Sequence, residues 1–151
     1  MEVITEEERI LILNWVLENQ HRFTNLRNSR LTYKIQESDL PLIFEVKNRI
    51  IEREGLQDNP LEPILGDFIG VILPGGHIHP HLDTNKGPLI HVRFNLFIQL
   101  PKKGCVTYYN HERLDSVERC YAKCYSGIHL HYSDVNEDTI SRIVISYGFL
   151  C

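Results

Sequence analysis

Three histidines and an aspartate lie close together in the stretch GGHIHPHLDTNKGP, which begins at Gly75. His77, His79, His81 and Asp83 offer potential metal ligands within one short segment framed by glycine and proline. In an extended segment, residues two apart share one face, so His81 and Asp83 could occupy neighbouring positions around one ion. The stretch is therefore either a metal site or a solvated loop.

A third ligand has to come from elsewhere in the chain. The stretch GIHLHYSD supplies two candidates, His129 and His131, again two residues apart. Two histidines and one carboxylate leave coordination positions open, which is the arrangement typical of non-haem Fe(II) oxygenases. With either candidate the set of three is complete, so we expect His77 and His79 to have structural roles.

A charged strand near the C-terminus strengthens this interpretation. In TISRIVISYGFL, alternation places Arg142, Val144 and Ser146 on one face, opposite Ile143, Ile145 and Tyr147. An arginine that points into a barrel is costly unless an anion meets it. A dicarboxylic acid such as 2-oxoglutarate would satisfy Arg142 through two parallel hydrogen bonds, with Ser146 beside it.

A second strand has the same two-faced character. In HVRFNLFIQL, one face is apolar and the other carries His91, Arg93, Asn95 and Gln99, with Phe97 interrupting. Two strands with one polar face each predict a wet, charged cavity. Arg93 and Asn95 are therefore further candidates for co-substrate contacts.

Two helices are expected before these strands. The first begins after Thr5, which forms a capping box with Glu8, and its expected apolar residues are Ile10, Leu11, Leu13, Trp15, Val16 and Leu17. A short strand is expected over Leu31–Gln36. The second helix should have Ser38 or Asp39 as its cap, Pro41 in its first turn, and Leu42, Ile43, Val46, Ile50 and Ile51 directed inward, and should end at Gly55.

Beyond about residue 67 the pattern changes to short alternating segments separated by Gly, Pro, Asn and Asp. The expected strands are Phe68–Leu73, Leu89–Leu100, Cys105–Asn110, Arg119–Tyr125 and Ile140–Leu150. Helices followed by strands, without β-α-β alternation, indicate an α+β and mainly β fold in which helices support an antiparallel barrel. We expect one domain over residues 1–151, with the helical part at about 5–55 and the barrel core at about 66–150.

Composition excludes several classes of function. The net charge is −4 and no basic stripe is present, so neither nucleic acid nor an anionic membrane is an expected partner. No apolar run approaches the ~20 residues of a membrane span, and the start MEVITEEER is acidic where a signal peptide would be basic. The four cysteines lack a CxxC pair, which favours reduced thiols and a cytoplasmic location.

The motif as a whole resembles a known family. LPGGHIHPH is similar to the P-G-x-H-hydrophobic-x-P-H signature of the aspartyl/asparaginyl β-hydroxylase group of Fe(II)/2-oxoglutarate-dependent oxygenases. The resemblance continues through GPLIHVRFNLFIQLPKKGC to the C-terminal histidine and arginine, and covers about residues 66–150. It implies a double-stranded β-helix of the jelly-roll or cupin-like kind, with Fe(II), 2-oxoglutarate and O₂ as cofactor and co-substrates.

The resemblance also implies roles for individual residues. His81 and His131 would be iron ligands; His131 is favoured over His129 because its spacing to Arg142 and the sequence HYSD fit the family better. Arg142 would bind the distal carboxylate of 2-oxoglutarate. Arg93 would reach the other end of the co-substrate or an acidic group of the substrate.

Two positions depart from the family. Asp83 stands where the animal members carry glycine, and it restores a full triad of ligands. Gly70 stands where those members have a carboxylate-binding serine, so co-substrate binding rests more on Arg142 and Ser146. The resemblance leaves the substrate open between a free amino acid and a peptidyl side chain of the Asp/Asn or Pro type, and the oligomeric state is also open.

Three alternatives compete with this interpretation. A cupin-type metalloenzyme would need a glutamate shortly after an HxH pair and a later P-x-G-x-x-H, and neither occurs. A non-catalytic 2-oxoglutarate-binding or sensor domain finds no support, because every ligand position is filled. A structural zinc site is four-coordinate and usually cysteine-rich, which the spacing of these cysteines does not allow.

Overall fold

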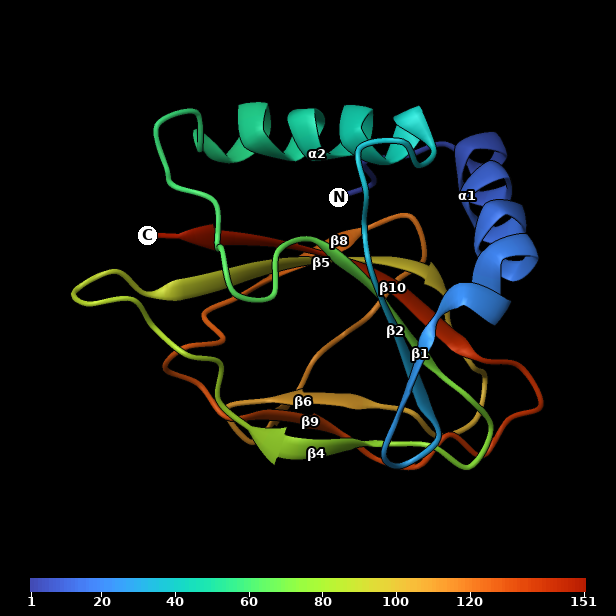
Figure 1. The fold of residues 1–151 in the computed structure, drawn as a ribbon. Helices are drawn as coiled ribbons and strands as arrows, with labels where there is room; N and C mark the ends of the chain where they lie inside the picture. The colour runs from blue at the N-terminus through green and yellow to red at the C-terminus, as the bar shows by residue number, and fades with distance from the viewer.

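A computed structural model describes all of residues 1–151 and contains two α-helices, one short 3₁₀ helix and ten β-strands (Figure 1). The helices are α1 (Glu6–Asn19), η1 (Gln20–Arg22) and α2 (Pro41–Glu54). The strands are β1 (Thr24–Leu26), β2 (Arg30–Lys34), β3 (Phe68–Ile72), β4 (Ile78–His81), β5 (His91–Gln99), β6 (Thr107–Tyr109), β7 (Glu112–Arg113), β8 (Tyr121–Cys124), β9 (His131–Ser133) and β10 (Arg142–Leu150).

The strands form two antiparallel sheets that face each other (Figure 1). The larger sheet has the order β1-β2-β3-β10-β5-β8, and the smaller sheet has the order β4-β9-β6-β7. From β3 onward the chain passes repeatedly from one sheet to the other, which winds the strands into a double-stranded β-helix. The expected mainly β fold with N-terminal helices is confirmed.

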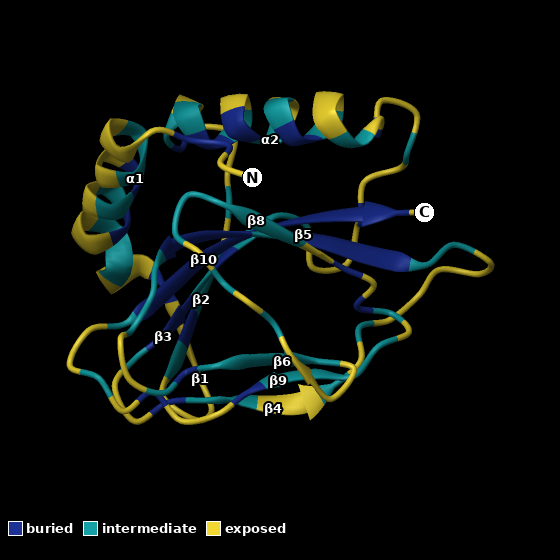
Figure 2. Ribbon diagram, turned by 180° about the vertical axis from the view of Figure 1, so that it is seen from behind, coloured by how far each residue is buried: buried dark blue, intermediate teal, exposed yellow.

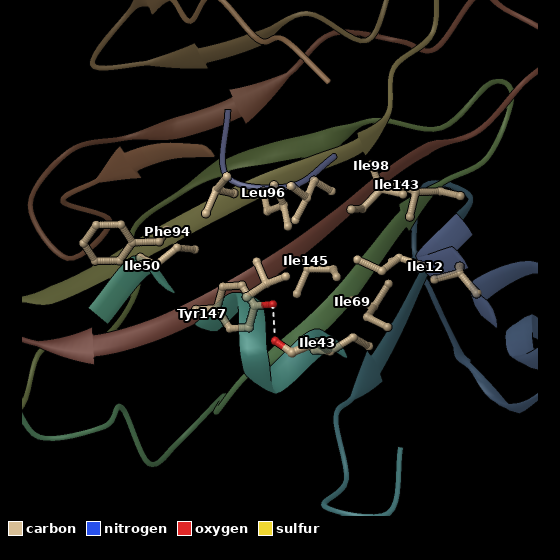
Figure 3. Close-up of a cluster of buried hydrophobic side chains, with 14 of the residues drawn as sticks. Ile12, Ile43, Ile50, Ile69, Phe94, Leu96, Ile98, Ile143, Ile145 and Tyr147 are labelled. Atoms are coloured by element: carbon tan, nitrogen blue, oxygen red, sulfur yellow. Dashed lines mark hydrogen bonds between the residues drawn. The ribbon is translucent and has the colours of Figure 1, made fainter. Parts of the chain in front are cut away.

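The hydrophobic core lies outside the barrel, between the helices and the outer face of the larger sheet. Figure 3 shows side chains of α1 and α2 packed against those of β3, β5 and β10, and the hydroxyl of Tyr147 donates a 2.7 Å hydrogen bond to the carbonyl oxygen of Ile43. In Figure 2, β5 and β10 are buried along almost their whole length, whereas the smaller sheet is largely half-buried or exposed. The space between the sheets is therefore left for polar side chains.

The expected faces of the two long strands are confirmed. Ile143, Ile145 and Tyr147 of β10 belong to the core, as do Val92, Phe94, Leu96 and Ile98 of β5. Arg142, Val144, Ser146, Arg93 and Asn95 point to the other side, into the space between the sheets.

The first helix begins with the expected capping box, and its expected apolar face is confirmed in part. Val16 is buried, and Leu13 and Trp15 pack against the core, together with Ile12, which was not expected. Residues four apart lie on one side of a helix, so Ile12 and Val16 form a narrow stripe against the sheet. Ile10, Leu11 and Leu17 lie outside this stripe and remain exposed.

The second helix begins at Pro41 and is ended by Gly55, whose φ of 66° is left-handed, as expected. The expected side-chain cap at Ser38 or Asp39 is wrong, because the cap residue is Leu40 and no side chain bonds to the first turn. The carboxylate of Asp39 instead accepts hydrogen bonds from the backbone N–H of Gln36 and the hydroxyl of Tyr33. Asp39 therefore closes the turn before the helix.

Most expected strands are present but shorter than the sequence pattern suggested, and the strand expected around His131 is β9. Three strands were not expected: β1, β4 and β7, each of two to four residues. The histidine-rich stretch is thus partly a strand, since β4 contains Ile78–His81. None of the helices combines the length and the hydropathy that spanning a membrane requires.

Candidate active site

Strand pairing in the smaller sheet brings His81 and His131 directly opposite each other. His81 is the last residue of β4 and His131 the first residue of β9, and the two are register partners in this antiparallel pair. Their rings lie 4.1 Å apart between centroids. The pairing therefore joins two side chains that are 50 positions apart in the sequence.

Asp83 follows β4 and completes the group. Its backbone N–H donates a 2.8 Å hydrogen bond to the carbonyl oxygen of Ser126, which fixes the loop. Its Oδ1 lies 3.7 Å from Nε2 of His81 and 3.9 Å from Nε2 of His131. One ligand atom from each of the three residues lies within 4.8 Å of the other two, so a single ion fits among them.

Backbone contacts orient both imidazole rings. Nδ1 of His81 lies 2.7 Å from the carbonyl oxygen of His79, and Nδ1 of His131 lies 3.1 Å from that of His129. A carbonyl oxygen can only accept, so Nδ1 carries the proton and Nε2 keeps its lone pair for a metal. Burial lowers the pKa of His131, which favours the neutral form that binds metals.

The remaining histidines of the two motifs stand apart from this group. The ring of His129 lies 2.8 Å from the hydroxyl of Tyr109, and His129 lies in the turn before β9. His79 is exposed and contributes its carbonyl oxygen, while His77 is half-buried; neither joins the candidate metal ligands.

A cavity of about 620 Å³ lies between the sheets and is bordered by all three candidate ligands. Arg142, Ser146, Arg93 and Asn95 also line it, so the structure brings every predicted site residue to one space. The single carboxylate on its wall is that of Asp83, against several cationic side chains. The cavity is therefore suited to anions.

Arg142 is buried in the wall of this cavity without a counter-charge. Its side chain makes no ion pair or hydrogen bond, its Nε has no partner, and its guanidinium carbon lies 5.7 Å from the ring centroid of Phe97. Burial lowers the pKa of Arg142. A buried charge of this kind is costly unless a ligand pairs with it.

Arg93 has a different environment. Its Nη2 donates to the buried carboxylate of Glu62 at 2.9 Å, and its Nη1 donates to the carbonyl oxygen of Gly66 at 2.5 Å. Glu62 in turn accepts hydrogen bonds from three backbone N–H groups in the loop that follows it. The charge of Arg93 is thus neutralised by the protein, although the side chain still borders the cavity.

The two uncharged candidates lie near each other on the larger sheet. Asn95 and Ser146 are register partners on β5 and β10, and the Asn95 amide donates to Sγ of Cys124 at 3.5 Å. Gly70 of β3 also borders the cavity, and a methyl group at this position would make only an ordinary contact of 3.7 Å with Phe68. The missing serine therefore leaves open space beside Val144.

Sequence reasoning missed several residues of the site. Glu62 lies in a loop without regular structure, and no spacing signal relates it to Arg93. His91 was placed on the polar face of its strand but given no role; its buried Nε2 has no hydrogen bond and lies 3.8 Å from Glu62 and 4.0 Å from Asp83. Tyr109, the register partner of His131, could have been suspected from its place in a cavity-facing strand.

No protein-family model matches the sequence, and no curated protein matches it. Solved structures do match. A prolyl-4-hydroxylase from Pseudomonas putida superposes with a TM-score of 0.70 at 14% identity, over 99% of this chain and 88% of that chain. The viral collagen prolyl hydroxylase of Paramecium bursaria Chlorella virus-1, in its 2-oxoglutarate complex, gives 0.74 at 10% identity, over 99% and 92%.

A third match is HygX from Streptomyces hygroscopicus with nickel and 2-oxoglutarate bound, with a TM-score of 0.72 at 8% identity, over 99% of this chain and 80% of that chain. The chain has the fold of the 2-oxoglutarate-dependent oxygenases. At such low identities the likeness concerns the fold, and the chemistry has to be argued from the residues of this chain.

The residues present fit both Fe(II) and 2-oxoglutarate. Two imidazoles and one carboxylate form a donor set that suits Fe(II) and leaves positions open. The orphaned Nε of Arg142 and the orphaned Oγ1 of Thr107 are buried polar atoms of the same cavity wall. Buried polar groups without partners are rare in folded proteins, and both are explained by a polar ligand in the cavity.

Proposed function

We propose that this chain is an Fe(II)/2-oxoglutarate-dependent dioxygenase that hydroxylates an amino acid or a peptidyl side chain, with release of succinate and CO₂. The observation that carries the proposal is that the His81–Asp83–His131 group and the unpartnered Arg142 face one cavity. Neither feature alone would suffice, because ligand-like triads and buried arginines each have structural explanations.

The three candidate ligands would hold the iron. The carbonyl oxygens behind His81 and His131 hold the Nδ1 side of each ring, which leaves Nε2 as the atom that would bind the iron. Asp83 supplies one negative charge and is held by its backbone bond to Ser126. When bound, Fe(II) supplies the oxidative chemistry that couples the decarboxylation of 2-oxoglutarate to hydroxylation by O₂.

Arg142 would bind and orient the co-substrate. A guanidinium presents a planar fork of donors that matches a carboxylate, and the protein offers Arg142 no other acceptor. Ser146, on the same face of β10 as Val144 and Arg142, would contribute a hydroxyl group, and Asn95 lies beside it. Arg93 is the candidate for the other end of the co-substrate or an acidic substrate group, provided that it can leave or share Glu62.

The class of substrate is part of the proposal. The signature LPGGHIHPH supports an Asp or Asn type of hydroxylation, as in the aspartyl/asparaginyl β-hydroxylase group. The solved structures of like fold support the Pro type or a small molecule, since they include prolyl hydroxylases and HygX with hygromycin B bound. A free amino acid or a side chain presented on a peptide fits all of these, and a cytoplasmic location remains our expectation.

Succinate formation tests the proposal. Purified protein is incubated with Fe(II), ascorbate, O₂ and 2-oxoglutarate, alone and with free Asp, Asn and Pro and with peptides that contain them. We expect Fe(II)-dependent succinate that one member of the panel stimulates, with a product heavier by one oxygen atom. Asp83→Ala should abolish the signal, whereas His77→Ala, a matched change outside the ligand group, should retain it.

Two outcomes would contradict the proposal in different ways. Tight 2-oxoglutarate binding without succinate under any substrate would make the chain a sensor or recognition domain. Metal-dependent turnover that does not need 2-oxoglutarate would instead favour a cupin-type metalloenzyme.

A further inference from the structure

The cavity contains a second cation close to Arg142, on a strand outside the β-helix itself. In the larger sheet, Arg30 of β2 and Arg142 of β10 are both register partners of Ile72, which lies on β3 between them. Directly paired residues point to the same face of a sheet, and both arginines line the cavity. Two strand spacings of ~4.8 Å separate their backbones, a gap that two arginine side chains can bridge.

Neither arginine has a counter-charge in the protein. Arg30 makes no ion pair or hydrogen bond through its side chain, and burial lowers its pKa. Burial also lowers the pKa of Arg142, and the nearby charge of Arg30 adds to this effect. The thiols closest to Arg142 do not compensate, because burial raises the pKa of Cys105 and raises that of Cys124 to about 11.

The side chain of Ile72 lies in the row of the two arginines, and open space lies in the next row of the sheet. In the next row of the sheet, Gly70 lies between Thr32 and Val144, and all three border the cavity. Because Gly70 has no side chain, this row leaves space between β2 and β10 on the cavity face of the sheet. The cavity therefore has room for a ligand next to this pair of arginines.

We infer that Arg30 is a second anchoring residue for the distal carboxylate of a dicarboxylic 2-oxo acid, which Arg30 and Arg142 bind from opposite sides of β3. A carboxylate has about four acceptor positions, enough for donors from two guanidinium groups. Arg30 would thus take the place of the hydroxyl group that is missing at Gly70. This inference rests on the proposed function, because it assumes that 2-oxoglutarate occupies the cavity.

Binding measurements without turnover test the inference. Titration calorimetry is performed on protein loaded with Mn(II), with 2-oxoglutarate as one probe and 2-oxobutyrate as the other. 2-Oxobutyrate keeps the metal-chelating 2-oxo acid and lacks the distal carboxylate. We expect Arg30→Gln to lower the affinity for 2-oxoglutarate about tenfold, as for the loss of a partly exposed charge-assisted contact. The affinity for 2-oxobutyrate should stay unchanged.

Matched variants control for charge and folding. Arg27→Gln removes an equal charge from the exposed turn of the same hairpin, outside the cavity lining, and should bind both probes as the wild type does. Arg30→Lys keeps the charge without the fork and should recover part of the loss. Thermal unfolding without ligand shows whether each variant is folded.

The possible results separate this inference from the proposed function. If Arg142→Gln weakens the binding of 2-oxoglutarate and Arg30→Gln does not, Arg30 is not an anchoring residue and the proposed function stands. An equal loss of affinity for both probes in Arg30→Gln would also overturn the inference, because it indicates a general electrostatic or structural effect. If the wild type does not bind 2-oxoglutarate at all, both proposals fall.

Discussion

Replacing Arg142 by methionine should leave the ligand-free protein at least as stable as the wild type. Arg142 is only 6% exposed and its Nε has no partner, so its charge is held in a costly environment. Methionine has a similar length and no charge. We expect the free energy of unfolding to be unchanged or raised by on the order of 1 kcal/mol, a small gain because the cavity admits water.

The same change should strongly lower the affinity of the protein for 2-oxoglutarate. Removal of one partner from a buried charge pair costs about 2–5 kcal/mol, or roughly 30- to several-thousand-fold in affinity. At a 2-oxoglutarate concentration of about 100 times the wild-type Kd, the wild type gains ~2.7 kcal/mol of stability. A variant that binds ~100-fold more weakly gains only ~0.4 kcal/mol, so its ligand-induced rise in Tm should be smaller by about 5–9 °C.

Thermal and urea unfolding of Mn(II)-loaded protein, with and without 2-oxoglutarate, measure both effects. Arg142→Lys should recover part of the affinity, and the metal content should stay near that of the wild type in both variants. The reasoning would be refuted if Arg142→Met unfolded more easily without ligand and yet bound 2-oxoglutarate normally. Arg142 would then be structural, and Arg93 would become the candidate anchor.

Replacing three other side chains should give effects that their contacts explain. Asp83→Ala should lower the affinity for Fe(II) on the order of 100-fold or more, measured by metal analysis after dialysis, with unfolding of the metal-free protein little changed. Glu62→Gln should lower the free energy of unfolding in urea by about 3–5 kcal/mol, because it leaves Arg93 buried without its partner. Burial opposes ionisation of Glu62, but backbone N–H donors and Arg93 lower its pKa overall. The ionised Glu62 therefore stabilises the fold above its ordinary pKa of 4.5, and this stabilisation is lost as the pH falls through the lower pKa of the folded state. Glu62→Gln should not show this pH-dependent loss of stability. Tyr147→Phe should cost about 1–2 kcal/mol in the same assay, because the 2.7 Å bond to the carbonyl oxygen of Ile43 is buried; no change in unfolding would show that water replaces it.

The long strands could be predicted from the sequence because their periodicity is sustained. β5 and β10 have nine residues each, and a register slip of one residue would turn every apolar side chain away from the core. With the apolar residues of β10 held in the core, alternation alone assigns Arg142 and Ser146 to the cavity face. The spacing of His81 and Asp83 was informative for the same reason, since residues two apart share one face in any extended segment.

Short elements and loop contacts could not be predicted in this way. β4 and β9 have four and three residues, too few for a periodic pattern, and they exist because each completes the backbone hydrogen bonds of the other. The pair of Glu62 and Arg93 depends on a loop that the backbone N–H of Glu62 ties to the carbonyl oxygen of Gly148. Nothing local in the sequence specifies such a contact.

The polar face of β2 lines the cavity, and this follows from the order of the strands in the larger sheet. Leu31 is buried in the core, so periodicity alone assigns Arg30, Thr32 and Lys34 to the opposite, polar face. In many antiparallel sheets the polar face meets solvent. Here the helices take up the apolar face of the larger sheet, and its polar face forms the wall of the cavity. Polar residues on that face of β2 are therefore candidates for ligand contacts, and pairing with β3 is what makes Arg30 one of them.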